Sequence, residues 1–187
     1  QNIAKAKGEI YKDLKNNGTA VINIDEPHAQ VWIKSTNAKV ITFSAQNIQA
    51  DFSAQNITSK KEGHFDFSLV TPEGTIQINL PLRGKHNIAN AVASAACAHT
   101  AGAKLQTIKD GLNNLTQVEG RMECTKLSPD LFLIDDSYNA SPGSVKAAID
   151  TLIEINGVSI LVLGDMAELG QDEIQLHADI GKYAFDA

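Results

Sequence analysis

The sequence has little of what secreted, membrane-spanning or nucleic-acid-binding proteins carry. It holds two cysteines, Cys97 and Cys124, which are too few for a disulfide scaffold and form no metal-binding pattern. No apolar run approaches the about 20 residues that a membrane helix needs, and the N-terminus lacks the apolar segment of a signal peptide. Lys and Arg (16) are outnumbered by Asp and Glu (22), so the net charge is −6. We therefore expect a reducing compartment, no membrane insertion and no nucleic-acid partner, while a local basic site for a phosphorylated small molecule stays open.

What the sequence does contain is typical of a folded globular chain. Its 187 residues are 43% hydrophobic and 20% charged, which is enough to build a core without metal or disulfide staples. The length corresponds to one or two domains. The chain opens at Gln1 directly with a helical pattern and closes at Ala187, where a further strand is expected. We therefore expect a piece of a longer polypeptide.

The first part of the chain, residues 1–118, alternates between helical and strand periodicity. The clearest signal is a β-hairpin, because apolar and polar residues alternate on both sides of a turn at 71–74. The helix that follows Asn87 is rich in small residues, and its predicted buried face comprises Ile88, Ala91, Val92, Ala95 and Ala96. The other predicted elements are a helix near the N-terminus, strands over 20–24 and 39–43, and a helix marked by Leu105, Ile108 and Leu112.

The second part, residues 119–187, is predicted to alternate strand and helix. Residues 131–134 and 158–163 are short apolar runs typical of strands covered on both faces, each followed by a helical pattern. Such a β-α-β-α order predicts parallel strands whose carboxyl ends share one edge, where ligands bind in α/β sheets. Asp135-Asp136 and Asp165 follow the two strands, so they are candidates to accept ribose hydroxyls or hold a divalent cation. For Asp165, helix capping or loop structure explains the residue equally well.

Lys7 is unusual because it lies on the apolar stripe that Ile3, Ile10 and Leu14 predict for the first helix. In most such cases the stem of the lysine is buried and the ammonium group reaches water. A lysine that is fully buried has a lowered pKa, and its neutral amine becomes reactive. The sequence leaves both interpretations open.

Two carboxamides and an arginine are further candidates. Asn87 and Asn90 are spaced i, i+3 at a helix N-terminus, where both amides can face one side and suit the edge of a heterocycle such as adenine. His86 precedes them and has no distinguishing signal beyond a loop position. Arg121, at the predicted domain junction, suits a phosphate through its planar fork of donors, or a salt bridge with an acidic neighbour, Glu119 or Glu123. Tyr138 either stacks on a ligand or packs.

Five stretches taken together resemble the Mur ligase family. They are residues 6–10 (AKGEI), 84–91 (GKHNIANA), 120–123 (GRME), 135–140 (DDSYNA) and 163–170 (LGDMAELG). The resemblance covers essentially the whole chain. It implies the later part of a central ATP-binding domain with a mixed sheet and helices over 1–118. Over 119–187 it implies the first part of a Rossmann-like C-terminal ligase domain, so the expected fold class is α/β.

The resemblance also implies a cytoplasmic, monomeric enzyme of peptidoglycan synthesis that uses ATP and Mg²⁺. In this reaction the γ-phosphoryl group of ATP passes to the terminal carboxylate of UDP-MurNAc-tripeptide, and the amine of D-Ala-D-Ala attacks the acyl phosphate. Because a carboxylate and a triphosphate repel each other, cations must neutralise their charges, and the enzyme must hold the two reacting groups in position. The resemblance places Lys7, carbamylated by CO₂, beside a Mg²⁺ ion, and Arg121 at the phosphates.

The remaining family roles fall on the nucleotide and the incoming dipeptide. The resemblance places Asn87 and Asn90 at the adenine with His86 nearby, Asp136 at the ribose and Asn139 near D-Ala-D-Ala. Gly84-Lys85 is not a phosphate loop, because the glycine required six residues before the lysine is Asn79 and His86 stands where Ser or Thr is needed. The resemblance places the family's phosphate loop before Gln1. We therefore expect the 187 residues alone to lack ligase activity.

Three alternatives stay open at this point. One is another amide ligase of the same superfamily, such as a folylpolyglutamate synthase, which substrate competition would separate. A second is a signalling receiver module, in which an acidic doublet and Asp165 would surround Mg²⁺. A third is a non-catalytic nucleotide-binding module. Arg121→Ala in the full-length protein separates the two, because a ligase should lose most of its turnover while still folding, whereas such a module has no turnover.

Overall fold

The computed structural model describes residues 2–15, 17–60, 63–155 and 157–187, and the chain divides into two compact units. The first unit comprises Gln1–Ser59, Phe65–Leu80 and Asn87–Leu115. The second comprises Lys60–His64, Pro81–His86 and Thr116–Ala187. Within the described ranges, no helix is long and apolar enough to cross a bilayer.

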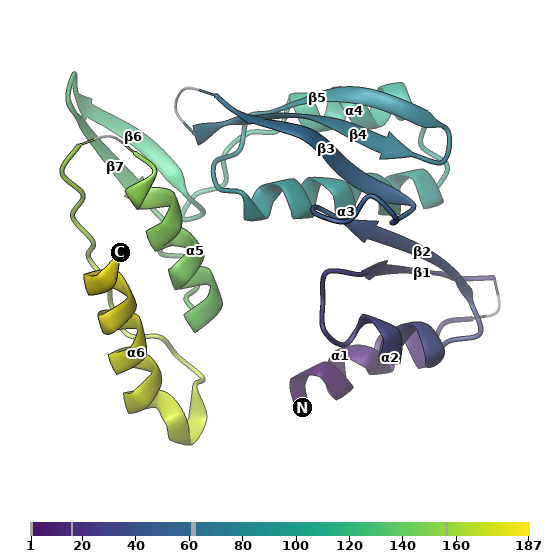
Figure 1. Cartoon of the computed structure of the whole chain (residues 1–187), viewed down its shortest axis with the longest axis horizontal. Helices are drawn as coiled ribbons and strands as arrows, with labels where there is room; N and C mark the ends of the chain where they lie inside the picture. Colours follow the sequence, from purple (N-terminus) through teal and green to yellow (C-terminus); the bar gives the residue numbers. More distant parts are fainter. Residues whose placement is uncertain (1, 16, 61–62, 156) are drawn as a thin grey trace. The chain divides into compact units, whose positions relative to one another are not determined.

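The first unit is built on a five-stranded mixed sheet in the order β1-β2-β3-β4-β5 (Figure 1). The first three strands run parallel, whereas β4 is antiparallel to both of its neighbours. The strands are β1 (Thr19–Asn23), β2 (Lys39–Ser44), β3 (Phe52–Ser59), β4 (Phe65–Thr71) and β5 (Gly74–Leu80). The predicted hairpin is confirmed: Thr71 pairs with Gly74, and Phe67 and Leu69 of β4 are fully buried.

The helices of the first unit are α1 (Asn2–Lys12), α2 (Ala29–Lys34), α3 (His86–Thr100) and α4 (Leu105–Asn113), with α3 in this unit from Asn87 onward. α3 and α4 run alongside β3–β5 (Figure 1), and α4 packs on β5. The amide N–H of Asn79 in β5 donates to Oδ1 of Asn113 at 2.9 Å. The predicted buried face of α3 is confirmed, since its five residues are at most 3% exposed.

The first helix is rotated from the face that periodicity predicted. Ile10 is 68% exposed and Lys7 is exposed too, so they do not form the buried stripe, and the side chain of Ile3 lies outside the described residues. The face that packs inward is instead Ala4, Gly8, Tyr11 and Leu14. Trp32 of α2 sets this rotation, because its Nε1–H donates to the carbonyl of Ala4 at 2.9 Å. Lys7 is therefore not a fully buried lysine on this face.

The second unit contains a two-stranded sheet and two α-helices. β6 (Glu123–Ser128) pairs with β7 (Leu131–Asp135), and α5 (Pro142–Ile153) packs on α6 (Glu173–Asp186), which the short η2 (Gly170–Asp172) precedes. Ser141 caps α5 as predicted, in a reciprocal capping box with Ser144. The core between the helices comprises Val145, Ile149, Met166 and Ile180.

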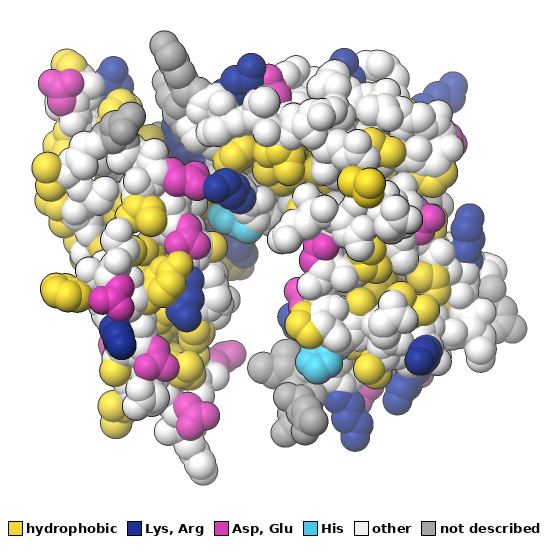
Figure 2. All heavy atoms as spheres, viewed as in Figure 1, with side chains coloured by type: hydrophobic (Ala, Val, Ile, Leu, Met, Phe, Trp, Pro, Cys, Tyr) yellow, Lys and Arg dark blue, Asp and Glu magenta, His cyan; other side chains and the backbone are white. Residues whose placement is uncertain are grey.

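The predicted parallel β-α-β run does not form. β7 is antiparallel to β6, and its residues Leu131, Phe132 and Leu133 are about half exposed. Residues 158–163 make no strand, with Val158 95% and Val162 91% exposed, and hydrophobic side chains are visible on the surface of this unit (Figure 2). An apolar run becomes a strand only beside a strand that takes up its hydrogen bonds. Among the described residues none pairs with 158–163, so Asp165 does not share a sheet edge with Asp135 and Asp136.

Candidate functional site

The turn before β6 and the segment after β7 are joined by backbone hydrogen bonds. The N–H of Tyr138 donates to the carbonyl of Gly120 at 3.0 Å, and the N–H of Met122 donates to Oδ1 of Asp136 at 3.1 Å. Arg121 stands between these two bonds. Two of the sequence-predicted candidates, Arg121 and Asp136, are therefore held together although the chain separates them by a complete hairpin.

The backbone of this turn explains the glycine of the GRME string and constrains Met122. Gly120 has φ +68, and a Cβ there would lie 3.2 Å from the amide nitrogen of Tyr138, so any side chain would crowd the joint. Met122 has φ +53 and is only 4% exposed. A left-handed conformation at a bulky residue costs about 1–3 kcal/mol, and it persists only where the surroundings enforce it. The hydrogen bond from Met122 to Asp136 is one such constraint.

Arg121 presents its charge at the surface. Its Cζ lies 4.2 Å from the centroid of the Tyr138 ring, in a cation–π contact, and both side chains are exposed. In the described part of the chain, neither Glu119 nor Glu123 forms an ion pair with it. A salt bridge with Glu119 or Glu123 therefore does not explain Arg121, and the Tyr138 ring contacts Arg121 at the surface instead of packing in a core.

His86 belongs to the same cluster. Its imidazole folds back over Gly84, where an added Cβ would lie 2.5 Å from Cε1. Burial lowers the pKa of His86, and the charge of Asp136 opposes that shift. Burial likewise raises the pKa of Asp136, against the opposing influence of the Met122 N–H, His86 and Arg121. The imidazole, guanidinium and carboxylate are thus close enough to interact, although no spacing in the sequence connects residues 86 and 136.

The segment that carries His86 is tied to α5. Lys85 forms an ion pair with Glu154, which follows the last residue of that helix. Both side chains are largely exposed, so the pair contributes at most about 1 kcal/mol. The pair is therefore a weak link between this segment and the end of α5.

The two carboxamides lie in the first unit. Asn87 and Asn90 face one side of the first turn of α3, as predicted, and Nδ2 of Asn90 donates to Oδ1 of Asn87 at 3.0 Å. The bond pre-orients the pair and leaves the carbonyl oxygen of Asn90 as an available acceptor. Lys7 and Asn139 are both exposed, on α1 and in the segment after β7.

The LGDMAELG string has a structural explanation. Met166 is fully buried in the core between α5 and α6, and its N–H donates to Nε2 of His177 at 2.9 Å. Nδ1 of His177 contacts the carbonyl of Glu173 at 2.9 Å, which fixes the proton on Nδ1. This anchor leaves Asp165 exposed in a loop. Sequence reasoning missed His177, since a single histidine in a helical pattern carries no signal.

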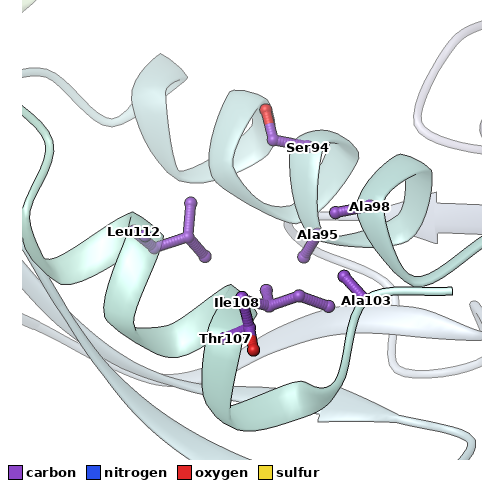
Figure 3. A pocket seen from close by; sticks show the side chains of 8 residues that line it. Ser94, Ala95, Ala98, Ala103, Thr107, Ile108 and Leu112 are labelled. Carbon is purple, nitrogen blue, oxygen red and sulfur yellow. The ribbon is translucent and has the colours of Figure 1, made fainter. Parts of the chain in front are cut away.

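A shallow pocket of about 200 Å³ lies between α3 and α4 (Figure 3). It carries no ionisable group, so it offers packing and no chemistry. Its lining is Ser94, Ala95, Ala98, Ala103, Thr107, Ile108, Gly111 and Leu112. No three His, Cys, Asp or Glu side chains among the residues that the structure describes are arranged to hold a metal ion.

The mixed sheet and its helices define an α/β protein, and the five sequence strings point to the ligase class. The sequence profile of the Mur ligase middle domain matches residues 1–98, and that of the Mur ligase glutamate ligase domain matches residues 120–187. The chain belongs to the Mur ligase family.

Three relatives illustrate the similarity. The UDP-N-acetylmuramoyl-tripeptide–D-alanyl-D-alanine ligase of Escherichia coli is 44% identical over 97% of this chain. The crystal structure of MurF from Acinetobacter baumannii superposes with a TM-score of 0.92 at 31% identity over 99% of the chain. MurF of Thermotoga maritima, solved in complex with ADP, shares the fold with a TM-score of 0.83 at 24% identity over 97% of the chain. The chain spans about 40% of the length of each of these proteins.

The alternative ligase, a folylpolyglutamate synthase, is less similar to this chain. A folylpolyglutamate synthase from L. casei matches 92% of this chain and 42% of its own length, with a TM-score of 0.65 at 20% identity. That likeness shows a shared fold alone. The receiver-module alternative is not supported either, because Asp165 does not join the acidic doublet at a sheet edge.

Proposed function

We propose that the full-length protein is the ATP-dependent ligase that adds D-Ala-D-Ala to UDP-MurNAc-tripeptide. The observation that carries the proposal is the cluster of His86, Arg121 and Asp136 in a chain whose relatives are named for this reaction. Residues 1–118 are then the later part of the central ATP-binding domain. Residues 119–187 are the first part of the C-terminal ligase domain.

The proposed reaction proceeds in two steps. An oxygen of the terminal tripeptide carboxylate attacks the γ-phosphorus of ATP, which gives an acyl phosphate and releases ADP. The amine of D-Ala-D-Ala then attacks the acyl carbon, loses a proton and expels inorganic phosphate, so one amide bond forms for each ATP cleaved. The residues of this chain contribute mainly by positioning and by placing positive charge near the phosphates.

The donor set of the cluster fits a nucleotide. The exposed guanidinium of Arg121 suits the phosphates, and Asp136 suits a ribose hydroxyl because its Oδ1 is already fixed by the Met122 N–H. In the proposed assignment His86, Asn87 and Asn90 contact the adenine. Asn139, exposed after β7, is assigned to the incoming dipeptide.

The residues described here do not form a magnesium site by themselves. Lys7, exposed on α1, would supply one ligand of Mg²⁺ if it is carbamylated, because a carbamate presents oxygen atoms that this cation prefers. The other ligands would come from chain beyond these residues.

The cellular setting follows from the proposed reaction. A ligase that completes a peptidoglycan precursor acts in cell wall biogenesis, and through it in cell shape, cell division and the cell cycle. We propose a cytoplasmic monomer, since UDP-linked precursors and ATP are soluble intracellular compounds.

The test measures phosphate release by the full-length protein with ATP, Mg²⁺, UDP-MurNAc-tripeptide and each candidate nucleophile. D-Ala-D-Ala should support turnover, whereas glutamate with a folate substrate should not. Arg121→Ala should lose most of the turnover while the protein still folds, which excludes a non-catalytic nucleotide-binding module. The isolated 187 residues should release no phosphate, because they contain no phosphate loop. Turnover with glutamate and folate but not with D-Ala-D-Ala would refute the assignment.

A further inference from the structure

We infer that Tyr138 is a positioning residue that holds the Arg121 guanidinium in the orientation in which it meets the nucleotide phosphates. The inference rests on the proposed function, and it assigns a role to a side chain for which the sequence left two roles open. Its basis is the stacked contact of 4.2 Å between Arg121 Cζ and the Tyr138 ring centroid.

The backbone around the pair is fixed independently of the tyrosine ring. The Tyr138 N–H bonds the Gly120 carbonyl at 3.0 Å, and the Met122 N–H bonds Asp136 at 3.1 Å. These bonds fix the Cα positions of Arg121 and Tyr138. They use main-chain atoms that any residue at position 138 would provide. The ring therefore adds orientation of the guanidinium and little else to this joint.

The exposure of the ring argues against a packing role. Tyr138 is 68% exposed and is not among the buried hydrophobic side chains. An arginine on an exposed turn otherwise samples many rotamers, and binding a phosphate would have to restrict them. A ring beneath the guanidinium already limits these rotamers before the nucleotide arrives, so binding loses less conformational entropy. This is preorganisation.

Electrostatics support the same role. Arg121 lies near enough to Asp136 to influence the pKa of that carboxyl, so an unconstrained guanidinium could turn toward the carboxylate. The π face of Tyr138 also attracts the guanidinium, more weakly. This contact involves the flat face of the guanidinium and leaves the N–H donors around its edge free. The donors of Arg121 thus stay available for an anionic ligand.

The test is ADP binding to the full-length protein, measured by titration calorimetry. An exposed cation–π contact corresponds to about a two- to fivefold change in a binding constant, so Tyr138→Leu should raise the Kd for ADP by about that factor. Tyr138→Phe keeps the ring and should restore the wild-type Kd. In an Arg121→Ala background, Tyr138→Leu should change the Kd by less than about 1.5-fold, since no guanidinium remains to be oriented.

The matched control is Phe132→Leu. Phe132 is also an exposed ring of the second unit under a cation, with Lys126 Nζ 5.6 Å from its centroid, but it lies on the hairpin away from Arg121. This variant should leave the Kd unchanged. Equal effects of Tyr138→Leu with and without Arg121, or a Tyr138→Leu protein with wild-type affinity, would overturn the inference. If Arg121→Ala itself binds ADP as tightly as wild type, the proposed role of Arg121 fails instead.

Discussion

Gly8 provides a test in which local propensity and tertiary packing predict opposite results. It lies in the middle of α1, where replacing glycine by alanine normally stabilises a helix by about 1 kcal/mol. A Cβ at this position would lie 2.9 Å from Cδ1 and 3.0 Å from Nε1 of Trp32, closer than side chains pack. Either the helix or the indole must move in Gly8→Ala.

The cost of that movement exceeds the gain. Trp32 is 8% exposed, and its Nε1–H is satisfied by the carbonyl of Ala4 at 2.9 Å. Overpacking a core costs about 1–3 kcal/mol, and leaving a buried donor without its acceptor costs a similar amount. Taking about 2–3 kcal/mol against the gain of about 1 kcal/mol from propensity, Gly8→Ala should lower the free energy of unfolding by about 1–2 kcal/mol.

The assay is urea unfolding of the 187-residue chain followed by tryptophan fluorescence. Trp32 is the only tryptophan, so the signal reports this contact directly. Gly111→Ala is the matched control, because Gly111 lies in α4 of the same unit and a Cβ there meets nothing within 4 Å. The control should be more stable than wild type by up to about 1 kcal/mol. If Gly8→Ala is stabilised like Gly111→Ala, packing against Trp32 does not set the rotation of α1.

Three further variants test the second unit. Gly120→Ala should lose about 2 kcal/mol of stability in urea unfolding, because it places a Cβ at positive φ and 3.2 Å from the Tyr138 amide; an unchanged midpoint would show that the joint adapts freely. His177→Ala removes the acceptor of the buried Met166 N–H, so exchange of that amide measured by NMR should accelerate with a loss of about 1–3 kcal/mol, and unaltered exchange would contradict the anchor. Burial lowers the pKa of His86 in the folded state, so the unfolded wild-type chain binds the proton more readily and wild-type stability falls as pH drops below about 6.5. His86→Gln removes this titrating group, so its stability should depend less on pH in the same range. Thermal melts at several pH values that keep the wild-type slope would refute this.

The sequence determined the elements whose partners are close along the chain. The hairpin of β4 and β5 was predictable because alternation and turn residues specify register within one short segment. The buried face of α3 was predictable because its five small and branched residues recur at helical spacing with no competing face. Ser141 followed by Pro142 likewise identified the start of α5, since a cap is a local arrangement.

Tertiary structure decided whatever depends on a distant partner. The rotation of α1 follows from Trp32, 28 residues from the carbonyl that it bonds, and periodicity cannot reveal such a partner. Residues 158–163 carry a strand pattern, yet a strand needs a neighbour to take up its hydrogen bonds. The approach of His86 to Asp136 and the stacking of Arg121 on Tyr138 depend on how a hairpin returns the chain. Residue types and periodicity thus indicated which side chains are available and which short segments form helices or hairpins. Long-range hydrogen bonds and packing determined which of those side chains come into contact.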